Sequence, residues 1–163
     1  MSLGSMLWIL LVIFTGLVCA ILIITKKTRS KGKWAVHNTT DLINDKQYTS
    51  LTLHAENESM GKKCALTVKC DQSNVIDIYI LWYTRLEEPP KVTTRFDKDV
   101  LVQSEWTISR SKIATFCKEV DPFVKKLLGS ERLVVRTTSY EKVQMTYTFS
   151  VRGLVNVINV SVD

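Results

Sequence analysis

The chain has 163 residues and carries 22 Lys and Arg against 16 Asp and Glu, a formal net charge of +6. Five of the basic residues lie between Lys26 and Lys33 and none precedes them, which leaves 17 basic against 16 acidic residues elsewhere. Because nucleic-acid-binding domains usually cluster basic residues on their own surface, this nearly neutral remainder argues against nucleic acid as a partner.

An apolar segment without a charged residue covers residues 6–25. Twenty helical residues at about 1.5 Å each span roughly 30 Å, the thickness of the hydrocarbon core of a bilayer. We therefore expect residues 1–25 to contain a transmembrane anchor that binds the lipid bilayer. A cleaved signal peptide is disfavoured, because it needs a charged stretch before a shorter apolar run and small residues at the cleavage site. The residues that we expect to mark the anchor are Met6, Trp8, Phe14, Gly16, Ala20 and Thr25.

Residues 26–33 form a basic linker that follows the apolar segment directly, and its charged residues are Lys26, Lys27, Arg29, Lys31 and Lys33. Taken alone, the positive-inside rule places this linker and the domain after it in the cytoplasm. The spacing of Gly16 and Ala20 matches a small-xxx-small pattern that lets two helices approach closely, so the chain could form a homo-oligomer. Chance placement of small residues in an apolar helix explains the same spacing.

Residues 34–163 are predicted to form one β-rich globular domain. Trp34 could lie in the membrane interface or begin the first strand. Residues 38–45 are rich in turn and cap formers and predict a loop or one helical turn. Alternating or β-branched runs predict strands at residues 48–55, 64–70, 75–83, 92–96, 100–108, 132–138 and 143–151. Residues 71–74 and 139–142 are predicted hairpin turns.

The one helical pattern covers residues 112–128, and Pro122 is expected to divide it into two short helices with Asp121 as the second N-cap. Gly129 is its expected stop. Residues 154–160 are expected to form a last short helix, with a strand as the alternative. Short strands at regular spacing without βαβ units predict an antiparallel β-sandwich with a helical insertion, preceded by one transmembrane helix.

Residues with catalytic or ligand-binding chemistry are few. His37 and His54 stand apart from any carboxylate or cysteine at metal-ligand spacing, and no phosphate-binding loop or nucleophile motif occurs. We therefore expect no cofactor and no metal. Cys64 and Cys70 are too far apart on one strand to bond to each other. Either Cys117 forms a disulfide with one of them, which needs an oxidising compartment, or all three are buried thiols.

Several short motifs follow one another in a specific order through residues 34–154. They are Trp34 before a polar segment, V-K-C ending at Cys70, V-x-x-R-F-D with Arg95 and Asp97, Trp106 before Ser109, L-V-V-R with Arg136, and F-S-V-R-G-L with Gly153. In this order the sequence resembles the TagO/VasI-like family, small periplasmic accessory proteins of bacterial type VI secretion, and related membrane-anchored prophage proteins.

The resemblance implies a non-enzymatic, β-rich domain on the periplasmic side of the bacterial inner membrane, opposite to the side that the lysine count favours. Some prophage proteins of this shape block entry of a second phage's DNA. We therefore expect a single-pass inner-membrane protein whose domain binds another envelope or phage protein, with superinfection exclusion as the preferred role. The alternative is an accessory protein of a type VI-like secretion system. A membrane-tethered enzyme is a third hypothesis, which requires a pocket with convergent polar groups.

Overall fold

The computed structural model describes residues 33–41, 43, 45–71 and 74–154. The predicted anchor and most of the basic linker lie outside these residues. Residues 155–160 of the last predicted helix also lie outside them. No helix among the described residues is long and apolar enough to cross a membrane. Lys33, the last residue of the linker, is described and exposed.

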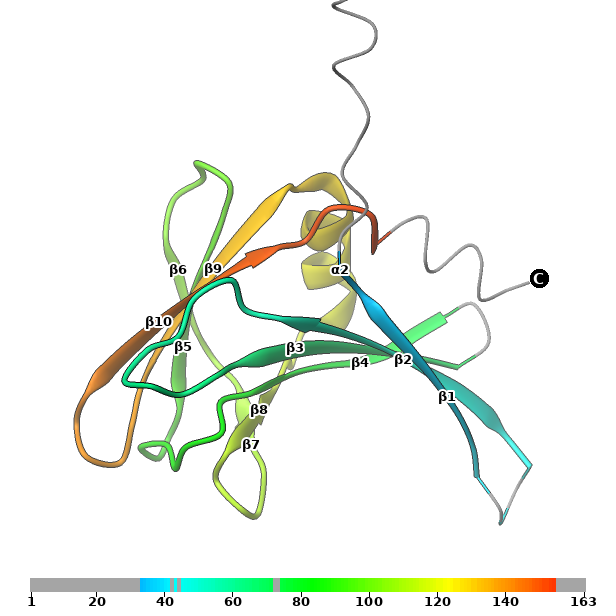
Figure 1. Cartoon of the computed structure of the whole chain (residues 1–163), viewed down its shortest axis with the longest axis horizontal. Helices are drawn as coiled ribbons and strands as arrows, with labels where there is room; N and C mark the ends of the chain where they lie inside the picture. Colours follow the sequence, from blue (N-terminus) through cyan, green and yellow to red (C-terminus); the bar gives the residue numbers. More distant parts are fainter. Residues whose placement is uncertain (1–32, 42, 44, 72–73, 155–163) are drawn as a thin grey trace, which may run out of the picture. The chain divides into compact units, whose positions relative to one another are not determined.

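The described chain is mainly antiparallel β-structure in two sheets with one helix (Figure 1). The large sheet has the strand order β1-β2-β3-β4-β8-β7, and the small sheet has the order β10-β9-β5-β6. The strands of the large sheet are β1 (Ala35–Thr40), β2 (Gln47–His54), β3 (Ala65–Asp71), β4 (Asn74–Leu81), β7 (Thr107–Ile108) and β8 (Ala114–Phe116). Those of the small sheet are β5 (Lys91–Phe96), β6 (Val102–Glu105), β9 (Arg132–Thr138) and β10 (Gln144–Ser150), and the helix is α2 (Val120–Gly129).

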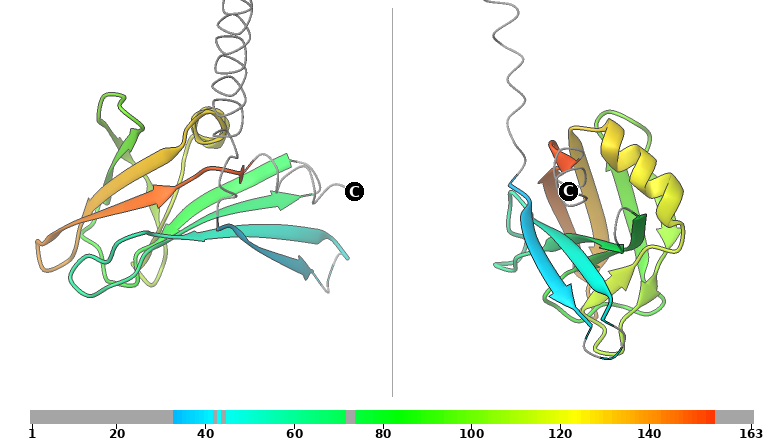
Figure 2. Two further views of the ribbon diagram at one scale, coloured as in Figure 1. Left: turned by 45° about the horizontal axis from the view of Figure 1, so that its top comes forward. Right: turned by 90° about the vertical axis from the view of Figure 1, so that its right-hand side faces the viewer.

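The hydrophobic core lies between the sheets, where each contributes the apolar side of its alternating strands. In β10, Met145, Tyr147 and Phe149 are buried and the intervening residues are not, as the alternation in the sequence predicts. The ring of Tyr147 packs against Trp82, which follows β4, with 5.9 Å between ring centroids. Figure 2 shows the β1–β2 hairpin, in blue and cyan, extending past the end of the small sheet, and every residue of β1 is exposed.

The predicted helical segment at residues 112–128 is wrong in its first part. The first half of the predicted helical segment is strand β8, because the free edge of β4 pairs with it from Tyr79↔Phe116 to Leu81↔Ala114. A helical spacing of apolar residues in so short a stretch does not outweigh this pairing. The helix begins only at Val120, after an N-cap position at Glu119 rather than Asp121, and Pro122 lies in its first turn, where no intrahelical N–H bond is lost.

The predicted strand at residues 100–108 is divided between the two sheets. Its first part is β6, which pairs with β5, and its second part is β7, which pairs with β8. Trp106 is the single residue between them. The predicted loop at residues 38–45 also begins too early, because Asn38 to Thr40 belong to β1 and pair with β2.

Candidate functional site

An apolar cleft lies between α2 and the inner side of β5 and β6. Its volume is about 290 Å³. Three aromatic rings form its floor: Phe123 of α2 contacts Phe96 of β5 at 5.2 Å between centroids and Trp106 at 5.4 Å, both edge to face. Such contacts hold the rings in fixed relative orientations. The further lining residues are Thr94, Val102, Ser104, Glu105, Cys117, Lys118, Glu119, Pro122 and Lys126.

Trp106 is fixed by a hydrogen bond as well as by packing. Its Nε1–H donates to Ser104 Oγ at 3.1 Å, and its side chain is only 4% exposed. The indole thereby pairs its one polar atom inside the same cleft whose floor it forms. In the sequence, Trp106 is marked only as a motif position. The structure places it at the junction of the two sheets.

The β6 side of the cleft is open to solvent. Val102 pairs with Thr94 and lines the cleft with it, yet Val102 is 44% exposed whereas Thr94 is 6% exposed. The two residues before it are more exposed still, Val100 at 81% and Leu101 at 58%. We call Val100, Leu101 and Val102 the hairpin patch. Val102 also lines the cleft, so the hairpin patch adjoins the cleft through this residue, and exposed apolar side chains grouped in this way often mark a protein-binding site.

Charged side chains border the cleft at both ends. Lys118 forms an ion pair with Glu105 at 3.6 Å, and Glu119 lies next to it in the chain. At the other end Lys126 lies over the ring of Phe96, with 6.0 Å from its Nζ to the ring centroid. The end near Glu105 therefore has two carboxylates and one ammonium, and the end near Phe96 has an ammonium.

Cys117 lines the cleft but has the properties of a structural thiol. Burial is the main cause that raises its pKa; a backbone hydrogen bond at Glu119 lowers it, and the carboxylates of Glu119 and Asp77 raise it further. Its Sγ–H also donates to the Glu119 carbonyl at 3.4 Å. A reactive cysteine needs the opposite shift, towards the thiolate. The cleft therefore lacks an activated nucleophile at this position.

Of the two alternatives for the cysteines, a disulfide with Cys117 or three thiols, the structure has free thiols at Cys64, Cys70 and Cys117. The sheet register explains this. The backbone of Cys117 bonds to Ile78 on one side of β4, whereas β3, which carries Cys70, pairs with β4 on its other side. Two strand spacings are roughly 9.5 Å, more than the roughly 7 Å that a disulfide allows between Cα atoms. Cys64 is even farther along, beside Ala65, which pairs with Leu81 at the opposite end of β4.

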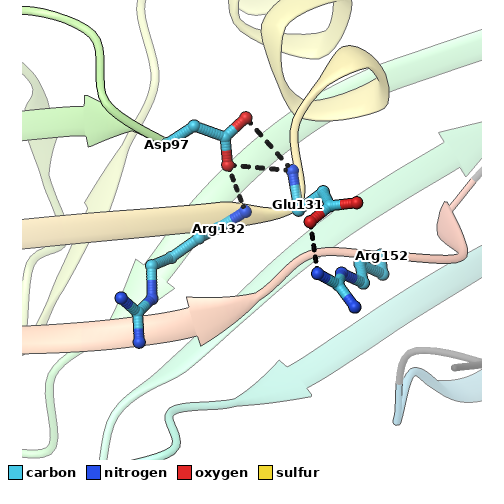
Figure 3. Close-up of polar contacts among 4 residues, drawn as sticks. All are labelled: Asp97, Glu131, Arg132 and Arg152. Carbon is cyan, nitrogen blue, oxygen red and sulfur yellow. Dashed lines mark hydrogen bonds and ion pairs between the residues drawn. The ribbon is translucent and has the colours of Figure 1, made fainter.

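A second, polar hollow of about 710 Å³ contains two of the motif segments. Asp97, which follows β5, accepts hydrogen bonds from the backbone N–H groups of Glu131 and Arg132, and the Glu131 carboxylate pairs with Arg152 (Figure 3). These contacts join the V-x-x-R-F-D segment to the F-S-V-R-G-L segment. Asp97 therefore has a structural role that accounts for its place in the motif.

The other predicted motif residues lie away from the cleft. Arg95 is exposed on β5 and pairs in register with Val134. Arg136 donates from Nε to Thr146 Oγ1 at 3.1 Å, between β9 and β10. Gly153 has φ of +82°, a backbone conformation that favours glycine and ends the β10 segment. The structure thus brings Asp97 and Gly153 to one end of the small sheet and leaves Trp106 alone in the cleft.

The two histidines, His37 and His54, are exposed on β1 and β2. Within the described ranges, no group of three or more His, Cys, Asp or Glu side chains is arranged to hold a metal ion.

No protein-family model matches the sequence, and no curated protein matches it. The structure is similar to the crystal structure of invasion associated protein B from Bartonella henselae, with a TM-score of 0.59 and 13% sequence identity. The match covers 82% of this chain and 92% of that chain. At this identity the similarity concerns the fold, and it agrees with two antiparallel sheets and one helix.

The cleft is not among the sites expected from the sequence. The sequence feature that could have indicated it is the apolar run Val100 to Val102, directly after the turn formers Asp97 to Asp99. A half-buried strand alternates apolar and polar residues, so three apolar residues in a row at a hairpin end cannot all face the core.

Proposed function

We propose that this chain is a single-pass inner-membrane protein whose β-sandwich binds another protein through the cleft between α2 and β6. One observation carries the proposal: the hairpin patch continues an aromatic-floored cleft that is open along β6. Protein-binding surfaces commonly combine a buried aromatic centre with a charged rim. Phe96, Trp106 and Phe123 supply such a centre here, and Glu119 and Lys126 belong to the rim.

The membrane part of the proposal rests on the sequence. Residues 6–25 are long and apolar enough to span a bilayer, and the basic residues after them suit anionic lipid headgroups. The short linker would hold the domain beside the membrane. The resemblance to periplasmic proteins favours a periplasmic domain, against the positive-inside count. A reporter fused after Asp163 that fluoresces only in the cytoplasm tests this, and a bright signal would overturn the periplasmic placement.

The preferred biological role is superinfection exclusion, in which the domain binds an envelope or phage protein that the second phage's DNA needs for entry. The resemblance to membrane-anchored prophage proteins supports this role, as does the apolar segment at residues 6–25, which is longer than a cleaved signal needs. The same motifs also favour the alternative, an accessory protein of a type VI-like secretion system. Phage genes beside the coding sequence would support the first role, and secretion sheath and tube genes the second.

The deciding experiment measures phage adsorption and DNA entry in cells that make the full chain. We expect normal adsorption and blocked entry. Leu101→Asp places a charge in the hairpin patch and is expected to restore entry, whereas Ile43→Asp, at a residue that is 96% exposed elsewhere, keeps the block. Normal DNA entry with the unaltered chain would contradict the exclusion role. A block that persists in Leu101→Asp would contradict the cleft as the binding site.

A further inference from the structure

The outer edge of β6 differs from the other strand edges of the described chain. β6 pairs with β5 alone, and no described residue pairs with its other side. The far edge of the small sheet, β10, is covered by the loop after β2, since Glu56 and Asn57 bond to the backbone of Thr146 and Thr148 at 2.8 to 3.0 Å. In the large sheet, β7 has two residues, and β1 has a polar sequence without an apolar cleft beside it.

An open strand edge leaves alternate backbone N–H and C=O groups without strand partners and can accept an additional strand. The four residues of β6 present such an edge over about 13 Å. Val102 and Ser104 on β6 face the cleft, so the inward side chains of an added strand would lie beside them and reach the same apolar space. The cleft is near the lower end of the roughly 300–1,000 Å³ of ligand pockets, a size that suits a few side chains.

We propose that β6 accepts an extended segment of the partner protein as an antiparallel strand, with apolar side chains at alternate positions in the cleft, a basic residue before them and an acidic residue after them. This proposal deepens the proposed function and rests on it. Antiparallel pairing matches the other pairs of the small sheet, and it is slightly more stable per residue than parallel pairing.

The charge order follows from the rim of the cleft. An antiparallel strand begins opposite Glu105 and ends opposite Val102. At the Glu105 end, Lys118 neutralises one carboxylate and leaves a net negative charge from Glu119, which favours a basic residue early in the segment. At the Val102 end, Lys126 favours a carboxylate late in the segment. A segment with the reverse order would place like charges together at both ends.

The test selects binders to the full chain in detergent micelles from a random library of seven-residue peptides. We expect enriched peptides with a basic residue early, alternating apolar residues and an acidic residue late. The double variant Glu119→Lys/Lys126→Glu is expected to enrich the opposite charge order and to bind the first set about tenfold more weakly. Three outcomes would each overturn the proposal. They are enriched peptides without a charge order, the same charge order for the unaltered chain and the double variant, and no enrichment at all.

Strand addition is tested separately with two N-methylated forms of one enriched peptide. Methyl groups on the odd-numbered or on the even-numbered backbone nitrogens block alternate N–H groups. We expect one form to lose at least about tenfold in affinity and the other to bind as the parent does, because only alternate N–H groups face β6. Equal loss in both forms, or in neither, contradicts strand addition.

The two proposals fail in distinguishable ways. If Leu101→Asp restores DNA entry while the enriched peptides show no strand pattern, the protein-binding cleft stands and the strand mode is wrong. If the peptides show the pattern while Leu101→Asp still blocks entry, β6 binds such segments and exclusion does not depend on that binding.

Discussion

Asp97 and Arg132 are joined by two hydrogen bonds across the end of the small sheet. The Asp97 Oδ1 accepts from the backbone N–H of Arg132 at 2.8 Å, and the Asp97 backbone N–H donates to the Arg132 carbonyl at 2.9 Å. Oδ1 also accepts from the N–H of Glu131 at 3.1 Å. One carboxylate therefore bonds the first backbone groups of β9, and it connects β5 to β9 beyond their last paired residues.

Substitutions at Asp97 should lower stability in a definite order. Asp97→Ala loses the side-chain hydrogen bonds to the N–H groups of Glu131 and Arg132. Alanine also has no side-chain acceptor to stabilise the left-handed backbone at φ of +46°, so we expect a loss of about 2 kcal/mol in the free energy of unfolding. Asp97→Asn keeps one acceptor oxygen and tolerates this φ, so its loss should be smaller. Urea denaturation measures the order. An equal loss in both variants would contradict a role through the carboxylate.

Asn57 protects the edge of β10. Its side-chain amide donates to the Thr146 carbonyl at 3.0 Å and its Oδ1 accepts from the Thr148 N–H at 2.8 Å, as a neighbouring strand would. We expect Asn57→Ala to lose about 1–2 kcal/mol of stability and to aggregate faster on storage, because the edge becomes free. Asn74→Ala, at an exposed asparagine at the start of β4, is the matched control. Light scattering that shows no difference between the variants would contradict this role.

Tyr147 predicts a pH dependence of stability at the alkaline end. Burial, with smaller contributions from Cys64 and Glu58, raises the pKa of Tyr147 from 10.0 to about 12. The unfolded chain therefore loses this proton near pH 10 and the folded chain only near pH 12. As pH rises through this window the unfolded state binds fewer protons, so the free energy of unfolding falls.

Tyr147→Phe should remove this contribution while leaving stability at pH 7 little changed, because the hydroxyl makes only long contacts of 3.4 Å to the Ser59 carbonyl and 4.0 Å to Met145 Sδ. Urea denaturation at pH 9, 10 and 11 measures the effect. Tyr140→Phe, at an exposed tyrosine, should keep the wild-type pH dependence. If the free energy of unfolding falls with pH equally in Tyr147→Phe and in the unaltered chain, the pH dependence does not come from Tyr147.

The cysteines should react according to burial. In a Cys19→Ser background, we expect iodoacetamide to leave Cys64 and Cys70 unmodified in the folded chain and to modify Cys117 slowly, since burial raises the pKa of all three thiols. All three should react in urea without a reducing agent, as free thiols do. Mass spectrometry gives the number of cysteines that iodoacetamide has modified. Two cysteines that react in urea only after reduction would show a disulfide.

The sequence predicted strands whose apolar residues alternate and whose partners are neighbours in the chain. β9 and β10 are the clearest case, because a turn at residues 139–142 sets their register and every second side chain of β10 is buried. The β3–β4 hairpin was predicted for the same reason. Local pattern fails at β8, whose three residues pair with β7 on one side and with the edge of β4 on the other. The pairing with β4 joins residues more than thirty positions apart, and no local window contains it.

The cleft could not be predicted for a related reason. Phe96, Trp106 and Phe123 belong to three separate elements, and each alone fits an ordinary core residue. Their meeting depends on the chain passing from one sheet to the other at Trp106 and on α2 packing Phe123 against Phe96 of β5. The motif residue Asp97, in contrast, was found from the sequence, but the motif did not show that its carboxylate bonds to backbone.

β6 and β7 belong to different sheets and only Trp106 separates them, so the floor of the cleft is attached to both sheets. Moving α2 away from this floor would separate Phe123 from Trp106 and from Phe96. If a protein segment binds in the cleft as proposed, it meets aromatic rings that are already in contact, and little ordering of these side chains opposes association. Selectivity would then come from the fit and charge of the incoming segment.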